Sequence, residues 1–263
     1  MSQIMPPSPR SGPPSSLITR RHALVGGAGL LLAGCDQINA SPATQALLSL
    51  GEKATRSAQR LITDRNALAK EYSRAEMSPV FRMNGTRDPG TEAYKALAAN
   101  GFADWTLSVD GMVRQPLKLS LAQLQAAPMR TQITRHDCVE GWSAIGEWTG
   151  VPLGLLLRRA GLSSYARYVV FHCADLYGGK PYYESIDMID AFHPQTILAT
   201  RLNGKPLVLG HGAPLRLRVE RQLGYKQAKY VMRVEAVSSL DAIHGGKGGY
   251  WEDSHGYQWY AGI

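Results

Sequence analysis

The chain has few cysteines and lacks the cysteine motifs that define several functional classes. Its 263 residues include three cysteines, and no two of them have the C-x-x-C spacing of a structural zinc site or a thioredoxin-like redox site. A C-x-x-C-H motif for covalent haem attachment is missing as well. These absences argue against a zinc-stabilised domain, a dithiol oxidoreductase and a c-type cytochrome.

Long apolar stretches, internal repeats and nucleic-acid-binding motifs are also missing. The uncharged stretch 23–34 is much shorter than the roughly 20 residues that span a bilayer. The formal charge is +8, of which +3 comes from residues 1–34 and +5 from the rest of the chain. This excess fits either solubility or an anion site, and no nucleic-acid partner is expected.

The first forty residues have the pattern of an export signal. The basic Thr19-Arg20-Arg21-His22 precedes the moderately apolar stretch 23–34, which is typical of a twin-arginine signal peptide. The stretch runs into Leu32-Ala33-Gly34-Cys35, which resembles a bacterial lipobox with Cys35 as the lipidated residue. Asp36 then predicts retention at the inner membrane. The alternative is a plain signal peptide cut after Ala40, and both place the mature chain outside the cytoplasm.

Composition and periodicity divide the chain into a signal segment (1–35), a helical membrane-proximal spacer (36–76) and one domain (77–263). Residues 44–72 are rich in good helix formers and predict one or two surface helices. The domain mixes strands and short helices without regular alternation, which predicts a single α+β domain with a large β component. We expect helices at 92–99, from 121 after a Ser120 cap, at 152–160 and at 187–192, and strands at 105–109, 129–135, 168–173, 197–202, 215–219 and 228–237.

Cys138 lies in a dense polar and aromatic segment, Arg135–Ser143, that follows a predicted strand. A nearby arginine can hold a cysteine as the thiolate, and the thiolate is the form that binds a soft metal. Arg135, His136, Asp137 and Glu140 are candidates for the same site. In an oxidising compartment the alternative is a disulfide between Cys138 and Cys173.

Six basic residues cluster within a short stretch near the end of the domain: Arg216, Arg218, Arg221, Lys226, Lys229 and Arg233. Arg216 and Arg218 share one face of a predicted strand because their spacing is two. A bound phosphate explains Arg216 and Lys229, whereas Arg218 and Arg233 are expected at the surface. The alternative is that the whole cluster is a solvated basic edge.

Several motifs in this order resemble the molybdopterin-binding domain of the sulfite-oxidase family: 138–143 (CVEGWS), 148–153 (WTGVPL), 168–171 (YVVF), 193–196 (HPQT) and 212–216 (GAPLR). The resemblance runs from about Phe81 to about Val237. It is nearest to the small bacterial periplasmic branch, which includes the catalytic subunit of periplasmic methionine-sulfoxide reductase. It implies a β-rich sulfite-oxidase-type fold with bound molybdenum and molybdopterin.

The resemblance also implies roles for individual residues. Cys138 matches the molybdenum ligand, and Glu140 and Arg135 are expected beside it as catalytic residues. Cys173 and His211 stand where the relatives have Thr and Asn. The positions that match cofactor-binding residues are Asn84, Arg87, Asp88, Cys173, His211, Arg216, Gln227, Ala228 and Lys229.

The function that this resemblance implies is oxygen-atom transfer to or from a small-molecule substrate. Electrons are expected to be exchanged with a membrane b-type or soluble c-type cytochrome, and the chain is expected to be monomeric. His136 and Asp137, directly before Cys138, argue against sulfite as substrate. The alternatives are a reductase of sulfoxides in proteins or small molecules, a metal-free anion-binding lipoprotein, and a disulfide-stapled structural lipoprotein.

Overall fold

The computed structural model describes residues 41–62 and 64–263. The predicted signal peptide and lipobox, Cys35 included, lie outside the described residues. The first helix of the described chain is α2 (Pro42–Ile62), which ends ten residues before Tyr72, the predicted end of the surface helices. No helix among the described residues is long and apolar enough to cross a membrane.

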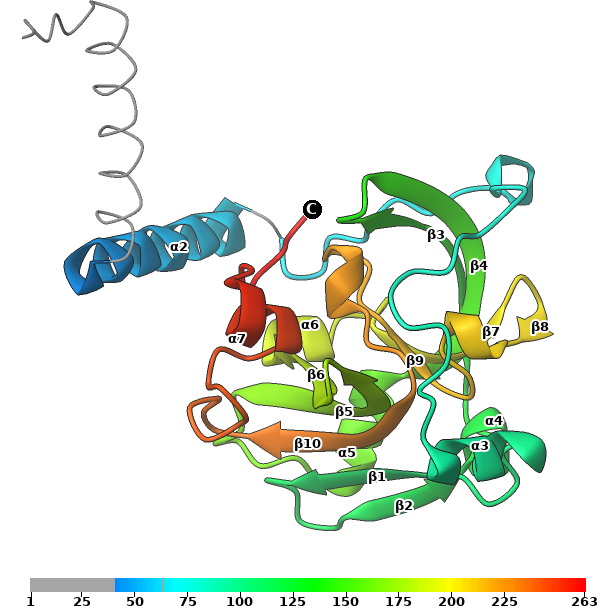
Figure 1. Cartoon of the computed structure of the whole chain (residues 1–263). Helices are drawn as coiled ribbons and strands as arrows, with labels where there is room; N and C mark the ends of the chain where they lie inside the picture. Colours follow the sequence, from blue (N-terminus) through cyan, green and yellow to red (C-terminus); the bar gives the residue numbers. More distant parts are fainter. Residues whose placement is uncertain (1–40, 63) are drawn as a thin grey trace, which may run out of the picture. The chain divides into compact units, whose positions relative to one another are not determined.

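The body of the protein, from Gln59 onward, contains two five-stranded sheets (Figure 1). The first has the order β2-β1-β10-β5-β6 and is formed by β1 (Thr106–Gly111), β2 (Leu117–Ser120), β5 (Tyr168–Tyr177), β6 (Lys180–Asp187) and β10 (Val231–Val237). The second has the order β3-β4-β7-β8, with β9 beside β7, and is formed by β3 (Arg130–Cys138), β4 (Trp142–Pro152), β7 (Ile197–Leu202), β8 (Lys205–Pro206) and β9 (Arg216–Arg218). All pairs are antiparallel except β1 with β10, which is parallel.

Short helices connect these strands, which confirms the α+β prediction. Their bounds are η1 (Arg74–Glu76), α3 (Glu92–Ala99), α4 (Leu121–Gln125), α5 (Leu153–Ala160), α6 (Met188–Ala191), η2 (Leu209–His211), η3 (Gly224–Lys226) and α7 (Tyr250–His255). The Ser120 hydroxyl accepts a hydrogen bond from Gln123 N at 3.2 Å and so caps α4 as predicted. Gly161 ends α5 with a φ of +68°, a left-handed conformation that favours glycine.

The main core joins the two sheets through apolar side chains and α5. Leu107, Phe171 and Val234 of the first sheet share one buried cluster with Leu198 and Leu217 of the second. Fully burying one such side chain contributes about 1.5–3 kcal/mol. The cluster therefore fixes the second sheet, and with it the β3–β4 hairpin, against the first.

Candidate active site

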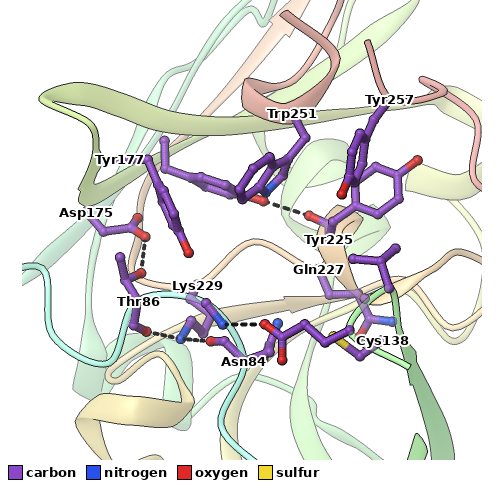
Figure 2. Close-up of a pocket in the computed structure, with 15 residues that line it drawn as sticks. Asn84, Thr86, Cys138, Asp175, Tyr177, Tyr225, Gln227, Lys229, Trp251 and Tyr257 are labelled. Atoms are coloured by element: carbon purple, nitrogen blue, oxygen red, sulfur yellow. Dashed lines mark hydrogen bonds between the residues drawn. The ribbon is translucent and has the colours of Figure 1, made fainter. Parts of the chain in front are cut away.

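One cavity of about 170 Å³ lies where the β3–β4 turn, the β5–β6 hairpin and α7 meet (Figure 2). The loop around Asn84 and η3 complete its wall. Its lining residues are Asn84, Gly85, Thr86, Cys138, Val139, Glu140, Asp175, Tyr177, Tyr182, Gly224, Tyr225, Gln227, Lys229, Trp251 and Tyr257. Segments from residue 84 to residue 257 thus converge on Cys138.

Cys138 is the last residue of β3 and pairs with Trp142 across the hairpin. Its side chain is half-buried, and burial raises the pKa of the thiol, whereas the nearby Arg216 acts to lower it. Cys138 and Cys173 are both free thiols, so the disulfide alternative is wrong in this structure. A free thiol that faces a cavity and a buried guanidinium can act as a metal ligand once it is deprotonated.

The alternation of β3 explains which of its polar residues reach the site. His136 is fully buried on one face, whereas Arg135 is exposed and its guanidinium pairs with Asp137 at 2.9 Å. Arg135, predicted beside the metal, is therefore not brought to the cavity. Glu140 does reach it: its carboxylate accepts hydrogen bonds from Trp142 Nε1 at 3.0 Å and from Gly85 N at 3.4 Å.

Arg216 is a fully buried cation without an ion pair among the described residues. Its Nη2 donates to Asn84 Oδ1 at 3.2 Å and its Nη1 to the His211 carbonyl at 3.5 Å, while its Nε has no partner in the described chain. Burial, and then the charge of Arg218, lower its pKa to about 9. A buried guanidinium with a free N–H group is a receptor for an anion.

Lys229 lies next to this guanidinium and faces the same loop. Its ammonium donates to the carbonyl of Asn84 at 2.6 Å, to that of Gly210 at 3.1 Å and to that of Thr86. Burial, and then the charge of Arg216, lower its pKa to about 7. The two cations therefore occupy one poorly hydrated region, which a bound anion would stabilise.

His211 belongs to the same group of residues. Burial and the charges of Arg216 and Lys229 lower its pKa to about 4, so the ring is neutral at pH 7. Its Nδ1 is buried without a partner in the described chain. Asn84, His211, Arg216 and Lys229, all predicted to bind the cofactor, are thus brought together.

Not all of the other residues predicted to bind the cofactor line the cavity. Gln227 is buried and lines the cavity, while Ala228 packs into the main core. Cys173 lies on β5, and burial raises the pKa of its thiol well above the ordinary value. Arg87 and Asp88 are exposed and do not line the cavity, where their neighbour Thr86 is found instead.

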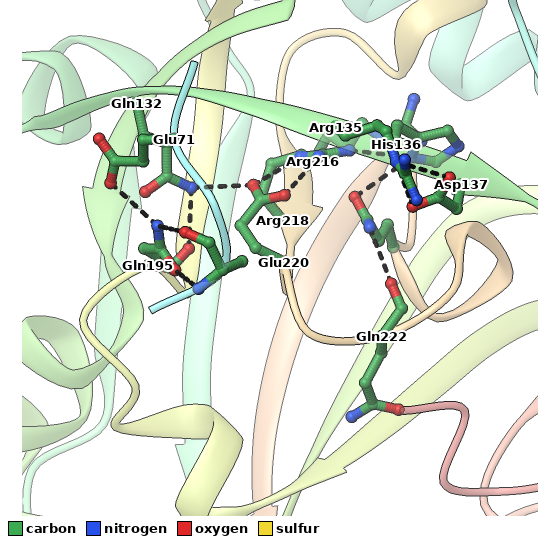
Figure 3. Close-up of polar contacts among 12 residues, drawn as sticks. Glu71, Gln132, Arg135, His136, Asp137, Gln195, Arg216, Arg218, Glu220 and Gln222 are labelled. Atoms are coloured by element: carbon green, nitrogen blue, oxygen red, sulfur yellow. Dashed lines mark hydrogen bonds and ion pairs between the residues drawn. The ribbon is translucent and has the colours of Figure 1, made fainter. Parts of the chain in front are cut away.

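Arg218, predicted at the surface, is fully buried, and this prediction is wrong. Its guanidinium pairs with Glu220 at 2.6 Å and donates to His136 Nδ1 at 3.0 Å (Figure 3). Both guanidinium groups contact the ring of Trp148, whose centroid lies 4.4 Å from Arg218 Cζ and 5.3 Å from Arg216 Cζ. The alternative of a solvated basic edge therefore fails for both arginines.

Several lining residues were missed from the sequence. Asp175 is buried, and its carboxylate accepts a hydrogen bond from the Thr86 hydroxyl at 2.5 Å. Burial raises its pKa, and its second oxygen has no partner in the described chain. Its position on the same strand as Cys173, two residues away, is the sequence signal that would have found it.

The comparisons with known proteins agree with this geometry. Residues 95–242 match the family model described as oxidoreductase molybdopterin binding domain. The chain belongs to this sulfite-oxidase-type family. It is 37% identical to a protein of Azospira oryzae that carries the provisional name protein-methionine-sulfoxide reductase subunit YedZ1, over 92% of this chain and 86% of that protein. The protein is accordingly a molybdopterin-dependent oxidoreductase.

Shorter matches include a catalytic subunit and a solved structure. The protein-methionine-sulfoxide reductase catalytic subunit MsrP of Xanthomonas axonopodis pv. citri is 39% identical over 57% of this chain and 50% of that protein. The match to MsrP therefore spans half of that relative's length. The sulfane dehydrogenase SoxCD of Paracoccus pantotrophus is 24% identical, with a TM-score of 0.49, over 54% of this chain and 41% of that chain.

The residues present fit the molybdenum–molybdopterin cofactor of this family. The unpartnered Nε of Arg216 and Nδ1 of His211 are suited to a phosphate, and the positive charge of Lys229, whose N–H groups already bind three carbonyls, adds to the attraction. Cys138 is free to provide a soft thiolate ligand. The cofactor phosphate would therefore supply the negatively charged partner that Arg216 and Lys229 do not find among the described residues.

Proposed function

We propose that this protein is a catalytic subunit that removes the oxygen atom from sulfoxides, with Cys138 as the thiolate ligand of molybdenum. The observation that carries the choice of substrate is the lining of the cavity: among the described residues it includes no arginine. Its lysine, Lys229, is engaged with three carbonyls. A cavity of this kind suits a neutral sulfoxide better than the sulfite anion.

The aromatic wall of the cavity supports the same choice. Trp251 and Tyr257 stack at 5.6 Å between ring centroids, and Tyr225 meets Tyr257 edge-on at 5.1 Å. Sulfur and its methyl group pack well against aromatic rings, with about 0.3–1.5 kcal/mol for each contact. The relatives named methionine-sulfoxide reductases point to the same substrate class.

The division of work follows from the contacts. The cofactor, when bound, supplies the exchange of one oxygen atom and two electrons. Arg216 and His211, with the positive charge of Lys229 beside them, would hold its phosphate, and Cys138 would hold its metal. Glu140, oriented by the Trp142 indole N–H, would deliver one proton to the departing oxygen and solvent water the other, since a sulfoxide takes up two electrons and two protons to give a thioether and water.

Molybdenum content and sulfoxide turnover test this proposal together. We expect about one molybdenum per chain in wild-type protein exported by a molybdenum-replete host, with methionine-sulfoxide reduction driven by a reduced viologen. Cys138→Ala should abolish turnover. Glu140→Gln should keep the metal and lower kcat by about 10²–10⁴-fold, the usual contribution of a general acid. Metal-free wild-type protein would instead support the anion-binding lipoprotein, and a metal-loaded protein that oxidises sulfite but leaves sulfoxides untouched would refute the substrate.

We also propose that the mature protein faces the periplasm, is anchored to the inner membrane through lipidated Cys35, and exchanges electrons with a membrane b-type or soluble c-type cytochrome. The export signal of residues 1–35 supports the location, and the relatives' designation as subunits supports an electron-transfer partner. Mass spectrometry of the mature N-terminus tests the anchor. A diacylated Cys35 is expected, and an unmodified N-terminus after Ala40 would refute it.

A further inference from the structure

Three buried charged residues lie directly behind the aromatic wall of the cavity. Lys226 Nζ contacts Glu184 Oε2 at 2.5 Å and Glu252 Oε1 at 2.5 Å, and all three side chains are at most 1% exposed. We call Glu184, Lys226 and Glu252 the buried triad. Two ionised carboxylates on one ammonium would leave a net negative charge in the protein interior, which is unfavourable unless it is compensated.

The two carboxyl groups also meet each other. A methyl group added at Gly249 would lie 2.0 Å from Glu252 Oε2 and 2.6 Å from Glu184 Oε2, so both oxygens converge on the space beside this glycine. Glu252 Oε2 has no other hydrogen-bond donor within the described part of the chain. Two carboxyl oxygens that face each other can form a hydrogen bond if one of them carries a proton.

The electrostatics favour that proton. Burial, and then the negative charge of Glu252, raise the pKa of Glu184 well above its ordinary value, although Lys226 acts in the opposite direction. With one proton, the triad has one acid, one carboxylate and one ammonium and is neutral. The other ionisable groups packed around it are Cys173 and Asp175 on β5, Tyr182 and Tyr183 on β6, and Asp253 on α7.

Each member of the triad is close in sequence to residues that line the cavity. Glu252 follows Trp251 on α7, and Lys226 stands between Tyr225 and Gln227. Glu184 is two residues after Tyr182 on β6. The Tyr182 hydroxyl donates to the Tyr225 carbonyl at 2.8 Å. The triad therefore connects the three elements that form the wall opposite Cys138.

We propose that Glu184 and Glu252 share a single proton above Lys226, and that this neutral triad positions the C-terminal wall of the cavity for substrate. The positioning role rests on the proposed function, since it concerns how a sulfoxide is held. The shared proton concerns the protein alone.

Unfolding as a function of pH tests the shared proton in cofactor-free protein. The native state then holds one more proton on the triad than the unfolded state above the unfolded carboxyl pKa, so wild type should lose stability relative to either single variant as pH rises between 5 and 8. Glu184→Gln and Glu252→Gln should each fold and lack this loss, because glutamine replaces the protonated acid. The wild-type unfolding constant should rise relative to either variant by up to about tenfold per pH unit.

The exposed Glu92→Gln serves as the matched control and should follow the wild-type curve. The double variant Glu184→Gln/Glu252→Gln leaves the Lys226 ammonium without a counter-charge and should be far less stable than either single variant. A band of a protonated carboxyl group in the infrared spectrum at pH 7, shifted in D₂O and absent from both single variants, is the direct signature. Equal pH slopes in wild type and single variants, or single variants that do not fold, would overturn the shared proton.

Kinetics test the positioning. Glu252→Ala should raise KM for methionine sulfoxide severalfold while molybdenum content and kcat stay within about twofold of wild type, and Glu252→Gln should restore KM. An unchanged KM in Glu252→Ala would overturn the positioning role. If wild type itself reduces no sulfoxide, the proposed function fails, while the unfolding and infrared results still decide whether the proton is shared.

Discussion

Substituting the two buried arginines by methionine should change stability in opposite directions. Arg216 has no ion pair among the described residues, and its lowered pKa of about 9 corresponds to an unfavourable environment for the charge of about 5 kcal/mol at most. Methionine fills similar volume without a charge. We therefore expect Arg216→Met to stabilise the cofactor-free protein by about 1–4 kcal/mol, somewhat offset by the lost contact with Trp148.

Arg218→Met is the matched control, because this arginine neutralises buried Glu220. Its loss leaves a carboxylate in the core with Gln132 Nε2 as its remaining donor at 2.8 Å. Breaking a buried pair in this way costs about 3–5 kcal/mol. For a body of this size that corresponds to a lowering of Tm by about 6–20 °C.

Two assays on the same variants separate stability from binding. Thermal unfolding is measured on protein from a host that cannot make the cofactor, and molybdenum and pterin are measured on protein from a replete host. Arg216→Met should have the higher Tm and yet retain little cofactor. A destabilised Arg216→Met that keeps full molybdenum content would refute the assignment of Arg216 as the anion receptor.

Three further predictions test the site and the sheet. The pKa of Lys229 is about 7 in the folded protein and about 10.4 when unfolded, so the stability of the cofactor-free protein relative to Lys229→Met should rise from pH 7 to 9 as measured by urea unfolding, below the pH at which Arg216 also titrates; equal pH slopes in the two proteins would contradict this. Gly224→Ala would place a methyl group 2.5 Å from His136 Nε2. We expect the free energy of unfolding to fall by about 1–3 kcal/mol and the molybdenum content to fall as well, and an unchanged Tm would contradict the packing. Gly150→Ala would place a methyl group 2.1 Å from the Leu198 carbonyl oxygen, a backbone atom that cannot move aside, so this variant should lose at least about 3 kcal/mol; wild-type stability would refute the β4–β7 register.

Elements with a clear local signal were predictable from the sequence. The Ser120 cap, the Gly161 stop and the helix at 92–99 are decided within a few residues, and the structure confirms them. Strand β4 gave no such signal, because Gly146, Glu147 and Gly150 interrupt its apolar pattern. These residues are buried by contacts with distant parts of the chain, such as Phe81 and β7. Strand β6 was missed for a related reason, since its buried Glu184 is paired with residues distant in sequence.

The site shows the same limit. That Cys138 would line a cavity and that Arg216 and Lys229 would lie together was predictable because these residues lie in recognisable motifs, but the side on which each residue faces depends on strand pairing. Arg135 was predicted at the site and Arg218 at the surface. The pleat of β3 leaves Arg135 exposed, and the position of β9 buries Arg218 against Glu220. The wall formed by α7 could not be predicted, because its partners Glu184 and Lys226 are far away along the chain.

The contact between Lys229 and the carbonyl of Asn84 joins residues 145 positions apart, and β1 pairs in parallel with β10 near the end of the domain. Closing loops of this length before any native contact forms makes folding slow. The cofactor-binding groups cannot meet on a ribosome that has not yet released the last strand, so loading must follow synthesis. Under the proposed export, a domain that must be complete before it is loaded would cross the membrane already folded, which is the kind of transport expected of the twin-arginine signal predicted in the first forty residues.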